Sequence, residues 1–189
     1  MKKWLLPILA IISLASIFIY YNANSGKKIA QPLDSFNNVQ VFYNGGFSKI
    51  HGRNVTADGY NLGLKYQCVE FVKRYYFEHL NHKMPNSYGH AKDFFNGSVK
   101  DGGINKQRNL TQYKNSSASK PKVNDLVIFA GSKFNKYGHV AIISKVTENS
   151  IEIVQQNVGT ATRASFKLNN LNSKWNIAND KVLGWLRKV

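Results

Sequence analysis

The chain has 189 residues, of which 43% are apolar and 13% aromatic, enough to build one compact domain with a hydrophobic core. Its single cysteine, Cys68, excludes an internal disulfide framework. The 26 Lys and Arg against 10 Asp and Glu give a formal charge of +16, which favours acidic partners such as anionic lipid or cell-wall polymers. The basic residues are scattered, without a helix-turn-helix or zinc-ligand pattern, so we do not expect nucleic-acid binding.

The N-terminal segment is typical of an export signal. Lys2 and Lys3 precede an apolar run without charge from Trp4 to Tyr21. This run is longer than a typical signal-peptide core of about 7–15 residues and lies at the lower limit for a membrane span. A cleaved signal and a retained membrane anchor therefore both stay open for residues 1–25. In either case the two lysines favour export of the rest of the chain, to the outer face of the membrane or beyond it.

Next we expect a short polar tether over residues 26–36, then one domain over 37–189. Residues 37–66 contain many glycines and predict loops with one short strand at 39–43. Residues 67–80 predict a helix, because apolar and aromatic residues recur at helical spacing from Cys68. On this reading Cys68 lies in the first turn, and the polar side of the helix carries Lys73, Arg74 and Glu78.

The second half of the domain has a different pattern. A short helix is expected at 88–95, and residues 96–124 predict loops rich in Gly, Asn, Ser and Lys. Strand-like runs then follow one another, separated by turns, at 125–129, 140–143, 151–154, 163–168 and 182–186. A helix followed by consecutive antiparallel strands predicts an α+β fold.

Cys68, His139 and a later amide group stand in the chain order of a papain-type nucleophile, base and orienting residue. His139 opens an apolar strand, and Gln155 or Asn157 on the following strand would fix the orientation of its ring. In an extended strand both amides would lie on the same face. For the oxyanion we predict two donors, the Cys68 main-chain N–H and the Gln67 side chain. A thiolate nucleophile at a helix N-terminus predicts a lowered pKa for Cys68.

The motifs around these residues resemble the CHAP family, the cysteine- and histidine-dependent amidohydrolases and peptidases. The likeness is strongest to the branch that contains the amidase domain of glutathionylspermidine synthetase. It extends from about residue 54 to the C-terminus and is carried by Tyr66–Phe71, Lys120–Val127, Gly138–Ile142, Gln155–Asn157 and Gly184–Trp185. The resemblance implies a papain-like fold of the NlpC/P60 type, with a helix bearing Cys68 packed on an antiparallel sheet bearing His139.

The resemblance also implies hydrolysis of an amide bond through a thioester on Cys68. Export and positive charge point to peptidoglycan as the substrate, and a glutathionylspermidine-type amidase is the alternative within the same chemistry. Gln155 departs from the family pattern, which has Glu at this position. A neutral amide cannot stabilise an imidazolium as a carboxylate does, so a weakened enzyme, or a silent membrane-tethered wall-binding module, is also open.

We expect no cofactor and no metal, and a monomer. His79 and His82 are spaced like metal ligands but have no further ligands nearby, which predicts exposed histidines. Some CHAP domains hold calcium before the cysteine, yet Asp58 and Glu70 are too few carboxylates for an oxygen cage.

Overall fold

The computed structural model describes residues 13, 16 and 26–188. Apart from Ser13 and Ser16, the predicted signal or anchor of residues 1–25 lies outside the described residues. No helix in the described part of the chain combines the length and the apolar character that a membrane span requires.

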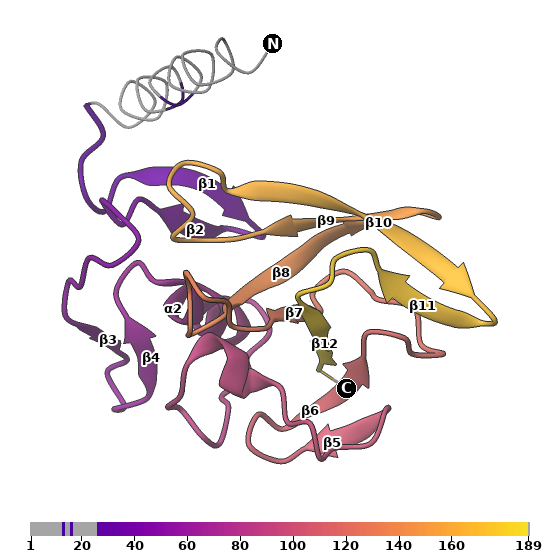
Figure 1. The fold of residues 1–189 in the computed structure, drawn as a ribbon. Coiled ribbons are helices and arrows are strands. Elements are labelled where there is room, and N and C mark those ends of the chain that lie inside the picture. The colour runs from indigo at the N-terminus through magenta and orange to yellow at the C-terminus, as the bar shows by residue number, and fades with distance from the viewer. Residues whose placement is uncertain (1–12, 14–15, 17–25, 189) are drawn as a thin grey trace, which may run out of the picture.

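The domain consists of one α-helix, one short 3₁₀ helix and twelve strands within the described residues (Figure 1). In chain order they are β1 (Pro32–Phe36), β2 (Val39–Phe42), β3 (Arg53–Val55), β4 (Asn61–Leu64), α2 (Cys68–Glu78), η2 (Ala91–Phe94), β5 (Gly103–Asn105), β6 (Leu110–Lys114), β7 (Leu126–Phe129), β8 (His139–Val146), β9 (Ser150–Val154), β10 (Arg163–Leu171), β11 (Lys174–Ile177) and β12 (Val182–Arg187).

Eight of these strands form one antiparallel sheet in the order β11-β10-β9-β8-β7-β12-β6-β5. The sheet curls on itself, since Ser117, after β6, forms a bridge with Trp175 of β11 at the opposite edge. Side chains alternate along a strand, so β8 serves two cores. Val140 and Ile142 face the core under α2, whereas Ala141 and Ile143 face the core inside the curl. The predicted α+β fold, with the cysteine helix packed on the histidine sheet, is confirmed.

Helix α2 begins at Cys68 and ends at Glu78, so it is shorter at both ends than the predicted span 67–80. Its buried face includes the predicted apolar residues, but Lys73 and Arg74 are buried as well. The prediction of a solvent-exposed side for these two residues is therefore wrong. The cause is tertiary, because the β3–β4 and β1–β2 hairpins contact the side of the helix that periodicity assigns to solvent.

The predicted tether of residues 26–36 contains β1, which pairs with β2. Arg163 of β10 donates to Asp34 of β1 at 2.8 Å and to Glu152 of β9 at 2.9 Å, and the hairpin lies beside these strands (Figure 1). The last five residues of the predicted tether thus belong to the folded unit in the structure. Pairs β3–β4 and β5–β6 likewise occupy regions predicted as loops, and the second helix is only the 3₁₀ turn η2.

Candidate active site

Cys68 lies at the N-terminus of α2, beside the start of β8. Its main-chain N–H belongs to the first helical turn and therefore has no partner within the helix. Strand β4 lies directly against this turn, because a Cβ on Gly63, whose φ is +127°, would lie 3.2 Å from the main-chain nitrogen of Glu70. Only glycine allows this close approach without a shift of the backbone.

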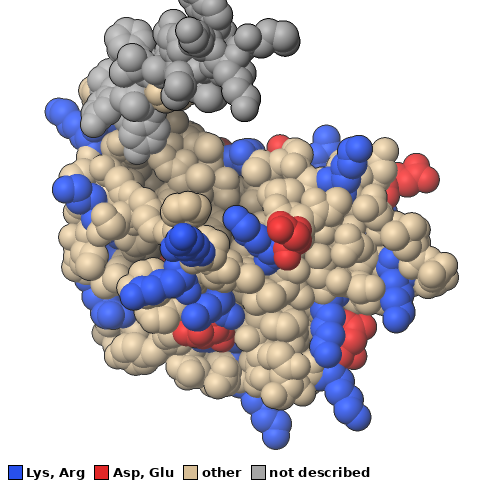
Figure 2. Space-filling view, viewed as in Figure 1, with Lys and Arg blue, Asp and Glu red and all other residues tan. Residues whose placement is uncertain are grey.

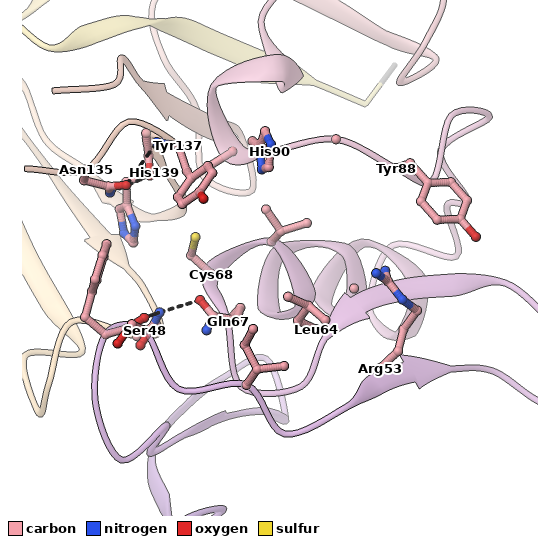
Figure 3. Close-up of a pocket in the computed structure, with 18 of the residues that line it drawn as sticks. Ser48, Arg53, Leu64, Gln67, Cys68, Tyr88, His90, Asn135, Tyr137 and His139 are labelled. Carbon is pink, nitrogen blue, oxygen red and sulfur yellow. Dashed lines mark hydrogen bonds between the residues drawn. The ribbon is translucent and has the colours of Figure 1, made fainter. Parts of the chain in front are cut away.

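His139 is the first residue of β8 and pairs with Phe129 on β7. The preceding Gly138 has φ of +73°, and a Cβ there would lie 2.4 Å from the carbonyl oxygen of Phe129. The glycine of the Gly138–His139 motif is thus required by the turn that places His139 at the first position of β8. Figure 3 shows the ring of His139 and the sulfur of Cys68 side by side at one pocket, from two elements 71 positions apart in sequence.

Gln155 fixes the tautomer of His139. The Gln155 Nε2 donates to the carbonyl oxygen of Ala161 at 3.0 Å, so Oε1 faces His139 Nε2, also at 3.0 Å. An amide oxygen can only accept, and His139 must therefore carry its proton on Nε2. This leaves Nδ1 with a free lone pair, as a general base requires.

Asn157 forms hydrogen bonds with Gln67 and Asn44 rather than with His139. It follows β9 with φ of +68°, which ends the extended alternation that would place it beside Gln155. Its Nδ2 donates to Gln67 Oε1 at 2.5 Å, and its Oδ1 accepts from Asn44 at 2.9 Å. The structure thus gives the contact with His139 to Gln155 alone, and Asn157 instead orients Gln67.

The two predicted oxyanion donors are adjacent. Gln67 Nε2 gives one N–H to the carbonyl oxygen of Lys49 at 2.8 Å, which leaves its second N–H unused at the pocket wall. The Cys68 N–H is the second donor. Their role at an oxyanion stays a prediction, but Asn157 and Lys49 hold the Gln67 amide in one orientation.

Thiol and imidazole are both neutral near pH 7 in this structure. Burial raises the pKa of Cys68 to about 11, although the main-chain amide of Val140 acts in the opposite direction. Burial likewise lowers the pKa of His139 to about 4, opposed by the hydrogen bond with Gln155. The shift of Cys68 is opposite to the predicted one, because the helix N-terminus does not outweigh desolvation and position 155 carries no charge. A neutral imidazole is nevertheless the form that accepts a proton.

Both residues line a pocket of about 560 Å³. Its rim is apolar and well exposed, with Phe47, Ile50, Tyr88 and Tyr137 between 45% and 68% accessible. None of the described residues that line it is Asp or Glu, whereas Arg53 is present. Arg53, Tyr88 and the rim carry no signal in the sequence, because they come from loops and short strands without periodicity.

Gln156 is a further residue that the motif alone did not explain. Its Nε2 donates to Glu70 Oε2 at 2.9 Å and to the carbonyl oxygen of Gln67 at 3.0 Å, and its Oε1 accepts from the Phe42 main chain at 2.7 Å. Glu70 in turn forms an ion pair with Arg74 at 2.6 Å. This buried network attaches the start of α2, which carries Cys68, to the segment after β9, which carries Gln155.

No group of three His, Cys, Asp or Glu that could hold a metal ion occurs among the described residues. The prediction of two exposed histidines holds for His79 alone. His82 is buried, with its Nε2 within 2.9 Å of the carbonyl oxygen of Arg108. The carboxylate of Glu70 accepts hydrogen bonds from Arg74 and Gln156.

Comparison with known proteins places this site in a family. A family model described as the CHAP domain matches residues 57–157. The chain is 30% identical over 106 residues to trypanothione synthetase of Crithidia fasciculata, and 34% identical over 109 residues to the bifunctional glutathionylspermidine synthetase/amidase of Escherichia coli, each match covering 56% of this chain. It is 35% identical over 79 residues, 42% of this chain, to the endolysin PlyTW of Staphylococcus phage Twort.

These matches cover only 15–17% of the length of the curated relatives. Among solved structures, the endolysin LysIME-EF1 is 20% identical with a TM-score of 0.40, covering 76% of this chain and 59% of that one. The family model, in contrast, matches more than half of this sequence and includes Cys68, His139 and Gln155. The chain therefore belongs to the CHAP domain family, whose members are cysteine- and histidine-dependent amidohydrolases.

Proposed function

We propose that this protein hydrolyses amide bonds of peptidoglycan outside the cytoplasm, with Cys68 as nucleophile and His139 as general base. The observation that carries the proposal is that Cys68 and His139 line the same pocket, where the contact of Gln155 with His139 Nε2 leaves the Nδ1 of the imidazole without a proton. The endolysin relative supports a cell-wall substrate. The apolar run before Tyr21 supports export, either with a cleaved signal or with a retained anchor.

In the proposed reaction His139 Nδ1 takes the thiol proton while Sγ of Cys68 attacks the carbonyl carbon. The oxyanion is stabilised by the Cys68 N–H and the free N–H of Gln67. The C–N bond then breaks, and the proton passes from His139 to the leaving amine, which leaves a thioester on Cys68. Water, deprotonated by His139, hydrolyses the thioester, releases the carboxylic acid and restores the thiol. Because both groups are neutral at rest, proton transfer accompanies the attack.

The surface charge supports an acidic polymer as the substrate. Lys and Arg side chains are spread over the face shown in Figure 2 and clearly outnumber the acidic ones. A cationic surface raises the local concentration of a polyanion such as a cell wall. This attraction is screened by salt, so binding to sacculi should weaken as ionic strength rises.

A glutathionylspermidine-type amidase is the second candidate, because the Escherichia coli relative carries that chemistry in its name. Such a substrate carries a polyamine, which is a cation at neutral pH. The described residues that line the pocket include no carboxylate to pair with it. The charge of the pocket therefore favours peptidoglycan.

The test is the release of dye from labelled sacculi by the purified chain. Wild-type protein should release dye, and Cys68→Ala should release none, with sacculus binding unchanged. Glutathionylspermidine is offered in parallel, and its faster hydrolysis would favour the second candidate. Binding of sacculi without turnover of either substrate would instead identify a silent wall-binding module.

A further inference from the structure

The pocket has two chemically different ends. Figure 3 shows His139 and Asn135 at one end, Arg53 and Tyr88 at the other, and the sulfur of Cys68 between them. In the proposed reaction His139 gives its proton to the leaving amine, so the amine lies at the His139 end. The acyl part of the substrate must then extend from Cys68 toward Arg53.

Arg53 is a cation without an acidic partner. Its Nη1 donates to Asn61 Oδ1 at 3.0 Å, and no carboxylate of the described residues forms an ion pair with it. The guanidinium lies 5.6 Å from the ring centre of Tyr88, which restricts its orientation from one side. Since a guanidinium carries five N–H donors, several remain free to bind a carboxylate in two-pronged geometry.

Two buried basic side chains lie behind this end of the pocket. Lys73 is fully buried and donates to the carbonyl oxygens of Asn61 and Ser87, whereas buried Arg108 donates to that of Tyr88 at 3.3 Å. Burial, together with repulsion from Arg108 and Arg53, lowers the pKa of Lys73 to about 7. Attraction by the carboxylate of Asp93 favours the charged form of Arg108. No carboxylate of the described residues contributes in this way to the pKa shift of Lys73. Arg108 thus places a positive charge behind Tyr88, whereas Lys73 is only about half protonated at pH 7.

We propose that Arg53 binds a free carboxylate on the acyl side of the scissile amide, so that the enzyme selects acidic acyl groups over their carboxamides. The inference rests on the proposed function for its direction along the pocket. Tyr88 and Ile50 would cover the apolar part of the same group. Arg53 acts here as a specificity residue, since it does not contact the reacting atoms.

The first test needs no substrate. Iodoacetate and iodoacetamide both alkylate Cys68, but only iodoacetate is anionic, so the ratio of their rates reports the positive potential at the pocket while the fraction of thiolate cancels. We expect Arg53→Gln to lower this ratio about fivefold, as the loss of one nearby charge implies. Arg53→Lys should retain most of the ratio. Lys106→Gln, which removes an exposed charge outside the pocket, should leave it unchanged.

The second test measures selectivity in hydrolysis. Two peptides are compared, identical except that the residue on the acyl side carries a free carboxylate or its carboxamide. Arg53→Gln should lower kcat/KM for the acidic peptide about tenfold or more and leave the carboxamide peptide within twofold of wild type. Thermal unfolding of each variant separates these effects from loss of fold.

Each outcome decides one of the two proposals. An alkylation ratio that is equal in wild type and Arg53→Gln, or that falls equally in Lys106→Gln, overturns the role of Arg53. Failure of the wild type to cleave either peptide or sacculi contradicts the proposed function, while the alkylation ratio still decides whether Arg53 attracts a carboxylate.

Discussion

The two ends of the pocket differ in charge. At the His139 end every group is neutral, because burial keeps the thiol protonated and the imidazole unprotonated, and Gln155 adds no charge. At the Arg53 end, Arg53 forms no ion pair with any carboxylate of the described residues, and Arg108 and Lys73 lie buried behind it. Proton transfer must therefore accompany attack at the His139 end, whereas the charge of Arg53 is present at the other end before a substrate binds.

The removal of His139 should have the largest effect and tests the neutral end. His139→Ala should lower kcat/KM by about 10²–10⁴-fold, the usual contribution of a general base. The rate of Cys68 alkylation by iodoacetamide at pH 7 should change by less than about threefold, because no charged pair exists to be lost. His79→Ala, an exposed histidine outside the pocket, is the matched control. A tenfold slower alkylation of His139→Ala would instead reveal a thiolate–imidazolium pair at rest.

The pH dependence of the free energy of unfolding tests the basic end of the pocket, because Lys73 is buried there. A lysine whose pKa is about 7 in the folded protein and near 10.4 in the unfolded chain binds more protons when unfolded between these values. The free energy of unfolding of the wild type should therefore rise with pH from about 7 to about 10, by up to about 1.4 kcal/mol per pH unit. Below pH 7 both states are protonated, and the full cost of burying the charge is present.

Lys73→Met should lack this rise, and the measurement is the difference between the two unfolding curves in denaturant across that pH range. Lys106→Met provides the exposed counterpart and should follow the wild type. Parallel curves for wild type and Lys73→Met would contradict a lowered pKa at Lys73.

Gln155→Glu should have the smallest effect and sharpens the contrast between the two ends. A carboxylate opposite His139 Nε2 stabilises the imidazolium, so we expect hydrolysis to stay intact or to rise a few-fold, and alkylation of Cys68 to shift to lower pH. The change also removes the donor to Ala161, a hydrogen bond of about 1 kcal/mol. A large loss of activity would show that this bond, rather than the charge, is what position 155 supplies.

The sequence by itself determined the family, and it predicted which residues form the site and in what order along the chain. A lone cysteine before a helical pattern, a Gly-His pair before an apolar strand and a later Gln predict a nucleophile, a base and an orienting residue, because they occur together in the order that this chemistry requires. Periodicity also indicated the helix and the consecutive strands, since buried faces repeat at 3.6 and 2 residues.

Only the tertiary structure decided which groups meet and how they are charged. Gln155 contacts His139 and Asn157 contacts Gln67 because Asn157, after β9, has a left-handed backbone conformation. Lys73 and Arg74 are buried because hairpins distant in sequence pack against them. Neighbours from other elements likewise set the pKa values of Cys68 and His139. They also leave Arg53 with a hydrogen bond to Asn61 and no ion pair among the described residues. Local patterns report which residues are apolar, but solvation and charge are set by whatever packs nearby in space.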